Sequence, residues 1–157
     1  ITGLDAGRPM VVRTPDADFT LANFMRSHLY SAVATLKIGM DILLKEEHVA
    51  VDSLMGHGGF FKTPVVGQRV MAAGMNAPIT VMDTASEGGA WGMAILAAFM
   101  KEKETGETLS SYLNDKIFAG QTGTTLQPEP EDVKGFEAFL EEYKRLLPAE
   151  KAAVAAK

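Results

Sequence analysis

Cysteine is absent from this chain of 157 residues, and so are long uninterrupted apolar runs. Without cysteine the protein has no disulfide and no thiolate metal ligand, which fits a reducing compartment, and we expect the cytoplasm. A membrane-spanning helix needs about 20 consecutive apolar residues, and no segment approaches that length. We therefore expect a soluble protein with no membrane partner.

Basic side chains are also scarce, with 15 Lys and Arg against 20 Asp and Glu and a net charge of −5. Nucleic-acid modules need clustered Lys and Arg to meet the phosphates, so we expect no nucleic-acid partner. His28, His48 and His57 are too scattered to predict a metal site. The first residue is Ile1 rather than methionine, and we expect a piece of a longer protein.

What is present is ordinary globular composition, 46% hydrophobic and 22% charged, enough for one core. Proline, glycine and apolar spacing place the elements. The expected elements are a short strand at residues 10–13, a helix capped by Thr20 and running to about Glu47, a buried strand at 51–55, a helix capped by Thr63 and ending at Gly74, a strand at 79–83, a helix opened by Ser86 and spanning 87–104, a short helix at 109–117, a loop at 119–131, a last helix from Glu131, and a frayed tail at 149–157.

The order of strand, helix, strand and helix predicts parallel strands joined by right-handed crossovers, and so an α/β fold with a short, mostly parallel sheet flanked by helices. We expect residues 1–105 to form its core. Residues 106–157 are expected to be a helical extension that packs on the same domain, with Phe136, Phe139 and Tyr143 facing that core.

Residues 56–62, Gly-His-Gly-Gly-Phe-Phe-Lys, follow the buried strand and are called the glycine loop below. In an open parallel sheet, ligands bind at the carboxyl ends of the strands. Glycines there let a flat or charged ligand touch the main chain, and a helix start favours negative charge. A nucleotide suits both features, although the same glycines would equally suit a tight turn without a ligand.

Two nucleotide motifs fail in the glycine loop. A P-loop needs glycine directly before its lysine and hydroxyl residue, where this chain has Phe61 before Lys62 and Thr63. A dinucleotide fingerprint fits Gly56 and Gly58 but also meets Phe61 at its last glycine. Asp83, at the end of the next strand, keeps a weaker dinucleotide interpretation open.

A longer pattern surrounds the glycine loop. It consists of a Gly-Gly pair, a Lys-Thr-Pro triplet, a helix carrying glutamine, a Gly-x-x-x-Pro step, a strand, a glutamate and the Ala-rich segment AWGMAILAAF. This order resembles the carboxyl-terminal domain of the FGGY carbohydrate kinases, and most closely their xylulokinase and ribulokinase branch. With the long helix before the loop and the last aromatic helix, the resemblance spans nearly the whole chain. The matching positions are Gly58, Gly59, Lys62, Thr63, Pro64, Gln68, Gly74, Pro78, Glu87 and residues 90–99.

The resemblance implies a partial ribonuclease H-like, actin-like ATPase domain that holds ATP with Mg²⁺ opposite a sugar-binding amino-terminal lobe. It implies the transfer of the γ-phosphoryl group to a sugar hydroxyl, with a ketopentose such as xylulose or ribulose as substrate, and leaves a homodimer open. The positions that it implies for ATP or ADP binding are Gly58, Gly59, Phe60, Thr63, Glu87 and Gly88.

The resemblance carries over neither a catalytic residue nor a metal ligand, since the family's catalytic aspartate and phosphate loops would precede Ile1. The chain would then be inactive on its own. Many family members have small residues after Gly-Gly where this chain has Phe60 and Phe61, so either ring could stack on adenine or both could pack in the core. Two other functions stay open, a dinucleotide-binding oxidoreductase domain that uses Asp83 and a non-catalytic interaction module.

Overall fold

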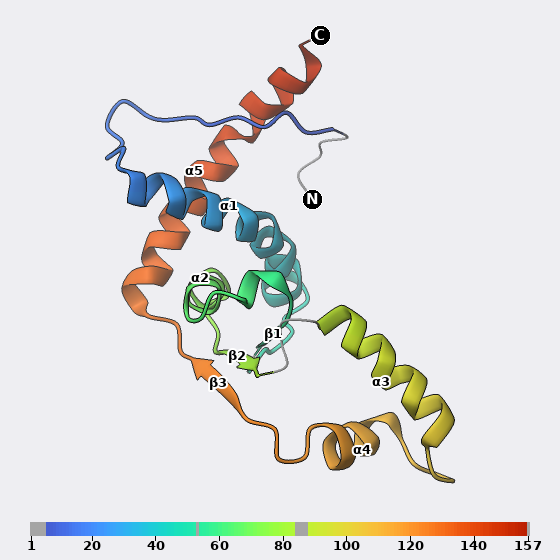
Figure 1. Cartoon of the computed structure of the whole chain (residues 1–157). Coiled ribbons are helices and arrows are strands. Elements are labelled where there is room, and N and C mark those ends of the chain that lie inside the picture. The colour runs from blue at the N-terminus through green and yellow to red at the C-terminus, as the bar shows by residue number, and fades with distance from the viewer. Residues whose placement is uncertain (1–5, 53, 84–87, 157) are drawn as a thin grey trace. The chain divides into compact units, whose positions relative to one another are not determined.

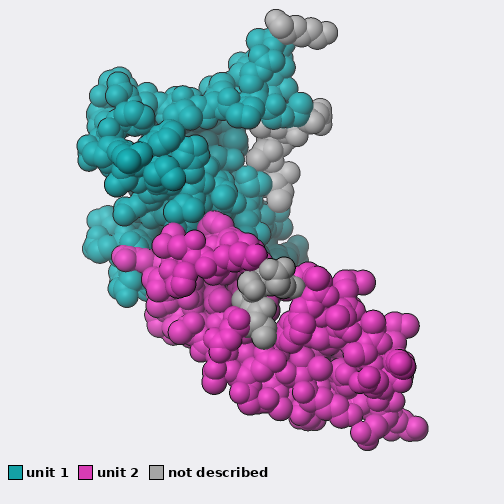
Figure 2. All heavy atoms as spheres, viewed as in Figure 1, with its two compact units in different colours: residues 1–52, 70–77, 128–157 teal, residues 53–69, 78–127 magenta. Residues whose placement is uncertain are grey.

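The computed structural model describes residues 6–52, 54–83 and 88–156 (Figure 1). The chain folds into two compact units (Figure 2), unit 1 with Ile1–Asp52, Val70–Ala77 and Pro128–Lys157, and unit 2 with Ser53–Arg69 and Pro78–Gln127. The helices and strands are α1 Leu21–Asp41, the π-helix η1 Ile42–Glu46, β1 Leu54–Gly56, the 3-10 helix η2 Gly59–Phe61, α2 Val66–Met75, β2 Ile79–Met82, α3 Gly88–Glu102, α4 Leu109–Tyr112, the π-helix η4 Leu113–Ile117, β3 Gly123–Leu126 and α5 Pro130–Ala155.

Unit 1 starts its helical part with α1, and Thr20 caps this helix as the sequence predicted. The backbone N–H of Asn23 donates a hydrogen bond to Thr20 Oγ1 at 3.2 Å, which satisfies one of the free donors at the helix start. α1 passes directly into η1, so helical backbone continues to Glu46. The predicted end at about Glu47 is therefore confirmed.

The core of unit 1 forms where α1 meets α5 and the second half of α2, and Figure 1 shows α1 crossing α5. The ring of Tyr30 lies 5.0 Å from that of Phe136 and 5.4 Å from that of Phe139. A Cβ atom on Gly74 would stand 2.8 Å from Val33 Cγ1 and 3.1 Å from Phe136 Cζ. Glycine at this position therefore lets α2 lie close against both helices, and the predicted packing of the aromatic stripe is confirmed at Phe136.

Unit 2 contains a three-stranded sheet in the order β1-β2-β3. β1 and β2 are parallel, with Leu54 opposite Ile79, and α2 connects them in the sequence, which confirms the predicted parallel pair. β3 runs antiparallel to β2, with Ile79 opposite Leu126. This strand lies within residues 119–131, where the sequence predicted a loop, so the sheet is mixed and the segment after residue 105 is not only helical.

The strand predicted for the Met-Val-Val-Arg segment is wrong. This segment has no regular secondary structure, and the side chains of Met10, Val11 and Val12 are exposed. A high β-propensity gives a strand only where a neighbouring strand offers a ladder of hydrogen bonds. The preceding backbone is instead tied to α5, since the N–H of Arg8 donates to Glu150 Oε1 at 2.6 Å.

The start predicted for α2 is also wrong, because Thr63 does not cap it. The glycine loop first closes into η2, and a turn through Pro64 and Val65 follows before α2 begins at Val66. Val65 has a φ of 70°, a left-handed conformation that is rare for a β-branched residue. The N–H of Val66 donates to the carbonyl of Pro64 at 2.8 Å, which completes the turn.

α3 and α5 are the longer helices in the second half of the chain. α5 continues past Pro148 to Ala155, so the tail predicted to fray is helical over most of its length, in keeping with the high helix propensity of alanine. α3 runs to Glu102, close to the predicted end, and the Ser86 predicted to open it lies outside the described residues.

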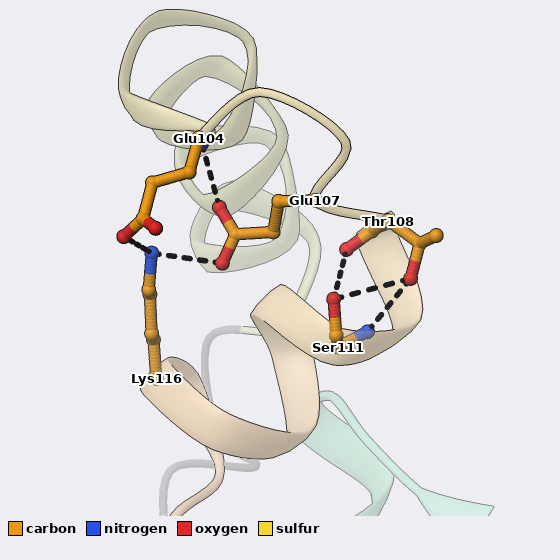
Figure 3. Close-up of polar contacts among 5 residues, drawn as sticks. All are labelled: Glu104, Glu107, Thr108, Ser111 and Lys116. Carbon is orange, nitrogen blue, oxygen red and sulfur yellow. Dashed lines mark hydrogen bonds and ion pairs between the residues drawn. The ribbon is translucent and has the colours of Figure 1, made fainter.

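The turn between α3 and α4 is held by polar contacts (Figure 3). Lys116 Nζ lies 2.8 Å from Glu107 Oε1 and 3.0 Å from Glu104 Oε1. The hydrogen bond from Lys116 lowers the pKa of Glu107, and both glutamates raise the pKa of Lys116 above its ordinary value. Thr108 caps α4 by accepting a hydrogen bond from the N–H of Ser111 at 3.1 Å. The carboxylates of Glu104 and Glu107 therefore stabilise the turn between α3 and α4.

We predict that Phe136→Ala lowers the free energy of unfolding by about 3–5 kcal/mol, because the ring is fully buried between α1, α2 and α5. Chemical denaturation followed by circular dichroism measures this loss. Phe139→Ala, at a half-buried ring on the same helix, is the matched control and should cost clearly less. Equal losses would contradict the placement of the core.

A second prediction concerns Asp41, which pairs with Lys37 at 2.7 Å and with Lys45 at 2.9 Å. Burial alone would raise the pKa of Asp41, but hydrogen bonds from both lysines outweigh burial and lower it. A carboxyl group whose pKa falls on folding stabilises the protein above its unfolded pKa near 3.8, and this stabilisation disappears as the pH falls through the folded pKa.

Asp41→Asn should therefore lower the free energy of unfolding by about 0.5–1 kcal/mol at pH 7. At pH 2 the variant and the parent protein should have nearly the same stability. Urea titrations at the two pH values measure both differences. A deficit of equal size at pH 7 and pH 2 would show that the ion pairs are not its cause.

Candidate functional site

The glycine loop begins at the end of β1 and has a defined backbone path. Gly58 has φ 95° and ψ −174°, a combination that is open essentially to glycine alone. Its carbonyl accepts a hydrogen bond from the N–H of Phe61 at 3.1 Å, and the carbonyl of Gly59 accepts one from Lys62 at 3.2 Å. These two bonds form η2 and bring the two phenylalanine rings back toward the sheet and α2.

Both phenylalanine rings pack against glycines of unit 2. A Cβ atom on Gly56 would stand 2.5 Å from Cε1 and Cζ of Phe61, and one on Gly67 would stand 3.0 Å from Cδ1 of Phe60. The two rings meet edge to face, with centroids 5.6 Å apart. Each ring is half-buried. The sequence left open whether these rings face a ligand or the interior. The contacts with Gly56 and Gly67 show that part of each ring packs against the protein.

The start of α3 lies against the glycine loop. A Cβ atom on Gly88 would stand 2.8 Å from Cβ of His57 and 3.2 Å from its Nδ1. The two segments that the sequence placed on either side of a nucleotide are thus neighbours in unit 2. His57, which makes this contact, was not among the positions that the sequence resemblance implies for nucleotide binding. Glu87, the other residue expected on this side, lies outside the described residues.

Three glycines around this junction have open space where a side chain would be. At Gly58, Gly59 and Gly89, no heavy atom of the described residues beyond the chain neighbours lies within 4 Å of the Cβ position. Gly59 and Gly89 have no positive φ, so a left-handed backbone conformation does not explain glycine there. Bare backbone at such positions allows a flat ligand to approach the main chain closely.

The side chain of Gln68 fixes the start of α2 to the sheet. Its Nε2 donates one hydrogen bond to the carbonyl of Ile79 at 2.7 Å and another to that of Thr124 at 2.6 Å. Among the described residues, Gln68 is the polar residue that is buried. The glutamine that the sequence pattern singled out therefore joins α2 to β2 and β3, and the glycine loop before it is held at both ends.

The other candidates lie at the surface. Thr63 and Lys62 are exposed in the turn before α2. Asp83, which a dinucleotide site would use to bind ribose, accepts a hydrogen bond from Thr122 Oγ1 at 3.0 Å. That bond ties the end of β2 to the segment before β3, which gives Asp83 a structural role.

Two further properties concern the described residues as a whole. None of their His, Asp and Glu side chains form a group of three or more that could hold a metal ion. None of their helices combines the length and apolar character needed to cross a membrane.

The comparisons with known proteins agree with the sequence pattern. The family described as the FGGY family of carbohydrate kinases, C-terminal domain, matches residues 1–100. This range covers the glycine loop, β1, α2, β2 and most of α3, and it stops short of the last helix that the sequence resemblance included. No curated protein and no solved structure matches.

Gly88→Ala tests whether the glycine loop and α3 are neighbours. The new methyl group would collide with His57, and overpacking of this kind costs about 1–3 kcal/mol. Gly89→Ala is the matched control, since its methyl group meets no described heavy atom within 4 Å beyond the chain neighbours and alanine favours the helix. Thermal denaturation should show a lower melting temperature for Gly88→Ala only. Equal melting temperatures for the two variants would contradict this contact.

Proposed function

Because the chain belongs to the FGGY family of carbohydrate kinases, we propose that unit 2 binds the ATP whose γ-phosphoryl group the complete kinase transfers to a sugar hydroxyl. The observation that carries this proposal is the junction of the glycine loop with the start of α3. There the backbone is bare at Gly58, Gly59 and Gly89, and no heavy atom of the described residues beyond the chain neighbours lies within 4 Å of these Cβ positions.

In this proposal, two segments of unit 2 hold the adenosine part of the nucleotide. Gly58, Gly59 and Phe60 form one side, with Thr63 at its edge. Gly88 at the start of α3 belongs to the other side, together with Glu87. Gly58 and Gly59 would leave their Cα atoms and peptide planes accessible to the ligand. This role requires residues without a side chain.

The chain's residues would contribute binding and orientation to the reaction. Phosphoryl transfer depends mainly on positioning and on stabilising charge around the transferred group, and an aspartate accepts the proton of the attacking hydroxyl. Asp83 is engaged by Thr122, and we assign no residue of this chain to that role. Kinases of this family use ATP with a metal ion. We propose Mg²⁺ as this ion, bound mainly through the phosphates of ATP.

We further propose a ketopentose such as xylulose or ribulose as the sugar, bound through a second lobe of the complete protein. The support is the order of the Gly-Gly, Lys-Thr-Pro, glutamine and glutamate positions, which is most similar to the xylulokinase and ribulokinase branch. Closure of the two lobes around both substrates would exclude water from the transfer step. Carbohydrate kinases of this family typically act in the cytosol, and we propose that location for this protein.

Gly59→Val in the complete protein tests the proposed function. Its side chain would enter open space, so the fold should tolerate it, whereas a nucleotide against this backbone would be displaced. We expect ATP affinity to fall at least about tenfold, equivalent to about 1.4 kcal/mol, with sugar affinity unchanged. Isothermal titration calorimetry with each substrate measures both.

Gly135→Ala is the matched control, since Gly135 also has open space at its Cβ position but lies on α5. It should leave ATP affinity unchanged. If Gly59→Val preserves ATP affinity and phosphorylation, the glycine loop is only a connection, as a non-catalytic interaction module would have it. A change in NADH fluorescence on mixing would favour the dinucleotide alternative instead.

A further inference from the structure

Of the three rings in the glycine loop, only that of His57 is exposed, whereas Phe60 and Phe61 are half-buried. Phe61 packs on Gly56, Phe60 packs on Gly67, and each ring presents an edge or a face to the other. An aromatic side chain that packs on its own backbone has less surface to offer to a ligand. The geometry therefore leaves His57 as the ring best placed to meet one.

The position of His57 also joins the two segments of the proposed site. It immediately precedes the bare backbone at Gly58 and Gly59, and its Cβ and Nδ1 lie within 3.2 Å of the Cβ position of Gly88. Glycine at position 88 is what lets the imidazole lie across the start of α3. No atom of this ring lies within 4 Å of the Cβ positions of Gly59 and Gly89.

Backbone contacts alone provide little affinity or selectivity for a nucleobase. Peptide planes and Cα atoms present the same groups to any flat ligand, whereas an aromatic ring adds a π-face on which a base can stack. Histidine is among the side chains that stack on bases in this way, and such stacking is tolerant of base identity. At Gly59 and Gly89, no heavy atom of the described residues beyond the chain neighbours lies within 4 Å of the Cβ position, and both residues are exposed.

We propose that His57 stacks on the purine base of the bound nucleotide, a role that neither the sequence pattern nor the family match assigns to it. This inference rests on the proposed function, since it places a residue within the proposed nucleotide site. It makes the imidazole the side chain that holds the base, while the glycines give the base access to the main chain.

The test compares four variants of the complete protein with the parent. His57→Ala should weaken ATP binding about tenfold. His57→Phe should restore it to within about threefold of the parent, because the substituted ring can still stack. His57→Leu, of similar bulk but without a π-face, should not restore it. His28→Ala, at an exposed histidine on α1, should bind ATP as the parent does. Calorimetry gives the affinities, and the melting temperature without ligand shows whether each variant is folded alike.

Each outcome decides the inference. Unchanged ATP affinity in His57→Ala would overturn it while leaving the proposed function intact. Equal ATP affinity in His57→Leu and His57→Phe would show that His57 only fills space. The same conclusion would follow if ATP affinity fell in parallel with the melting temperature without ligand across all three His57 variants. Absence of saturable ATP binding to the parent protein would instead remove the proposed function, and the inference with it.

Discussion

The two hydrogen bonds donated by Gln68 are the interaction on which the site depends. One buried amide nitrogen reaches the carbonyls of Ile79 on β2 and Thr124 on β3, so the start of α2 is fixed to both strands at once. β1 holds the glycine loop at its other end through its ladder with β2. A loop fixed at both ends has its backbone path set by the protein rather than by a ligand, which is the preorganisation that tight binding requires.

The glycines of unit 2 serve different physical purposes. Gly56, Gly67 and Gly88 make room for Phe61, Phe60 and His57, respectively, and Gly58 supplies a backbone conformation that other residues avoid. Packing and conformation together account for these four positions. They do not account for Gly59, where a side chain would meet open space and φ is not positive. Among the described residues, Gly59 is therefore the glycine of the loop to which neither packing nor a positive φ assigns a role.

Local signals predicted the elements that depend on local physics. The Thr20 cap, the apolar stripe of α1 and the parallel pair across α2 follow from hydrogen-bond donors and periodicity near in sequence. β3 could not be predicted in this way, because Gly-Thr-Thr-Leu lacks apolar alternation and becomes a strand only through pairing with β2 and the bond to Gln68. The contact of His57 with Gly88 likewise joins residues far apart in sequence. Its only local signal was a histidine beside the glycine pair.

A site built largely from backbone has a consequence for specificity. Main-chain groups can accept a flat ligand and restrict its orientation, but they differ little from one loop to another, so discrimination among ligands must come from the side chains at the border. Both phenylalanines of the glycine loop contribute part of their surface to packing, which leaves less of it for a ligand. Gln68 and Phe61 help to define the shape of the loop, so in the proposed site they would be distinct from the residues that contact the nucleotide, whereas Phe60 would serve both purposes. Sequence change at the border can then alter ligand preference without disturbing the fold that presents it.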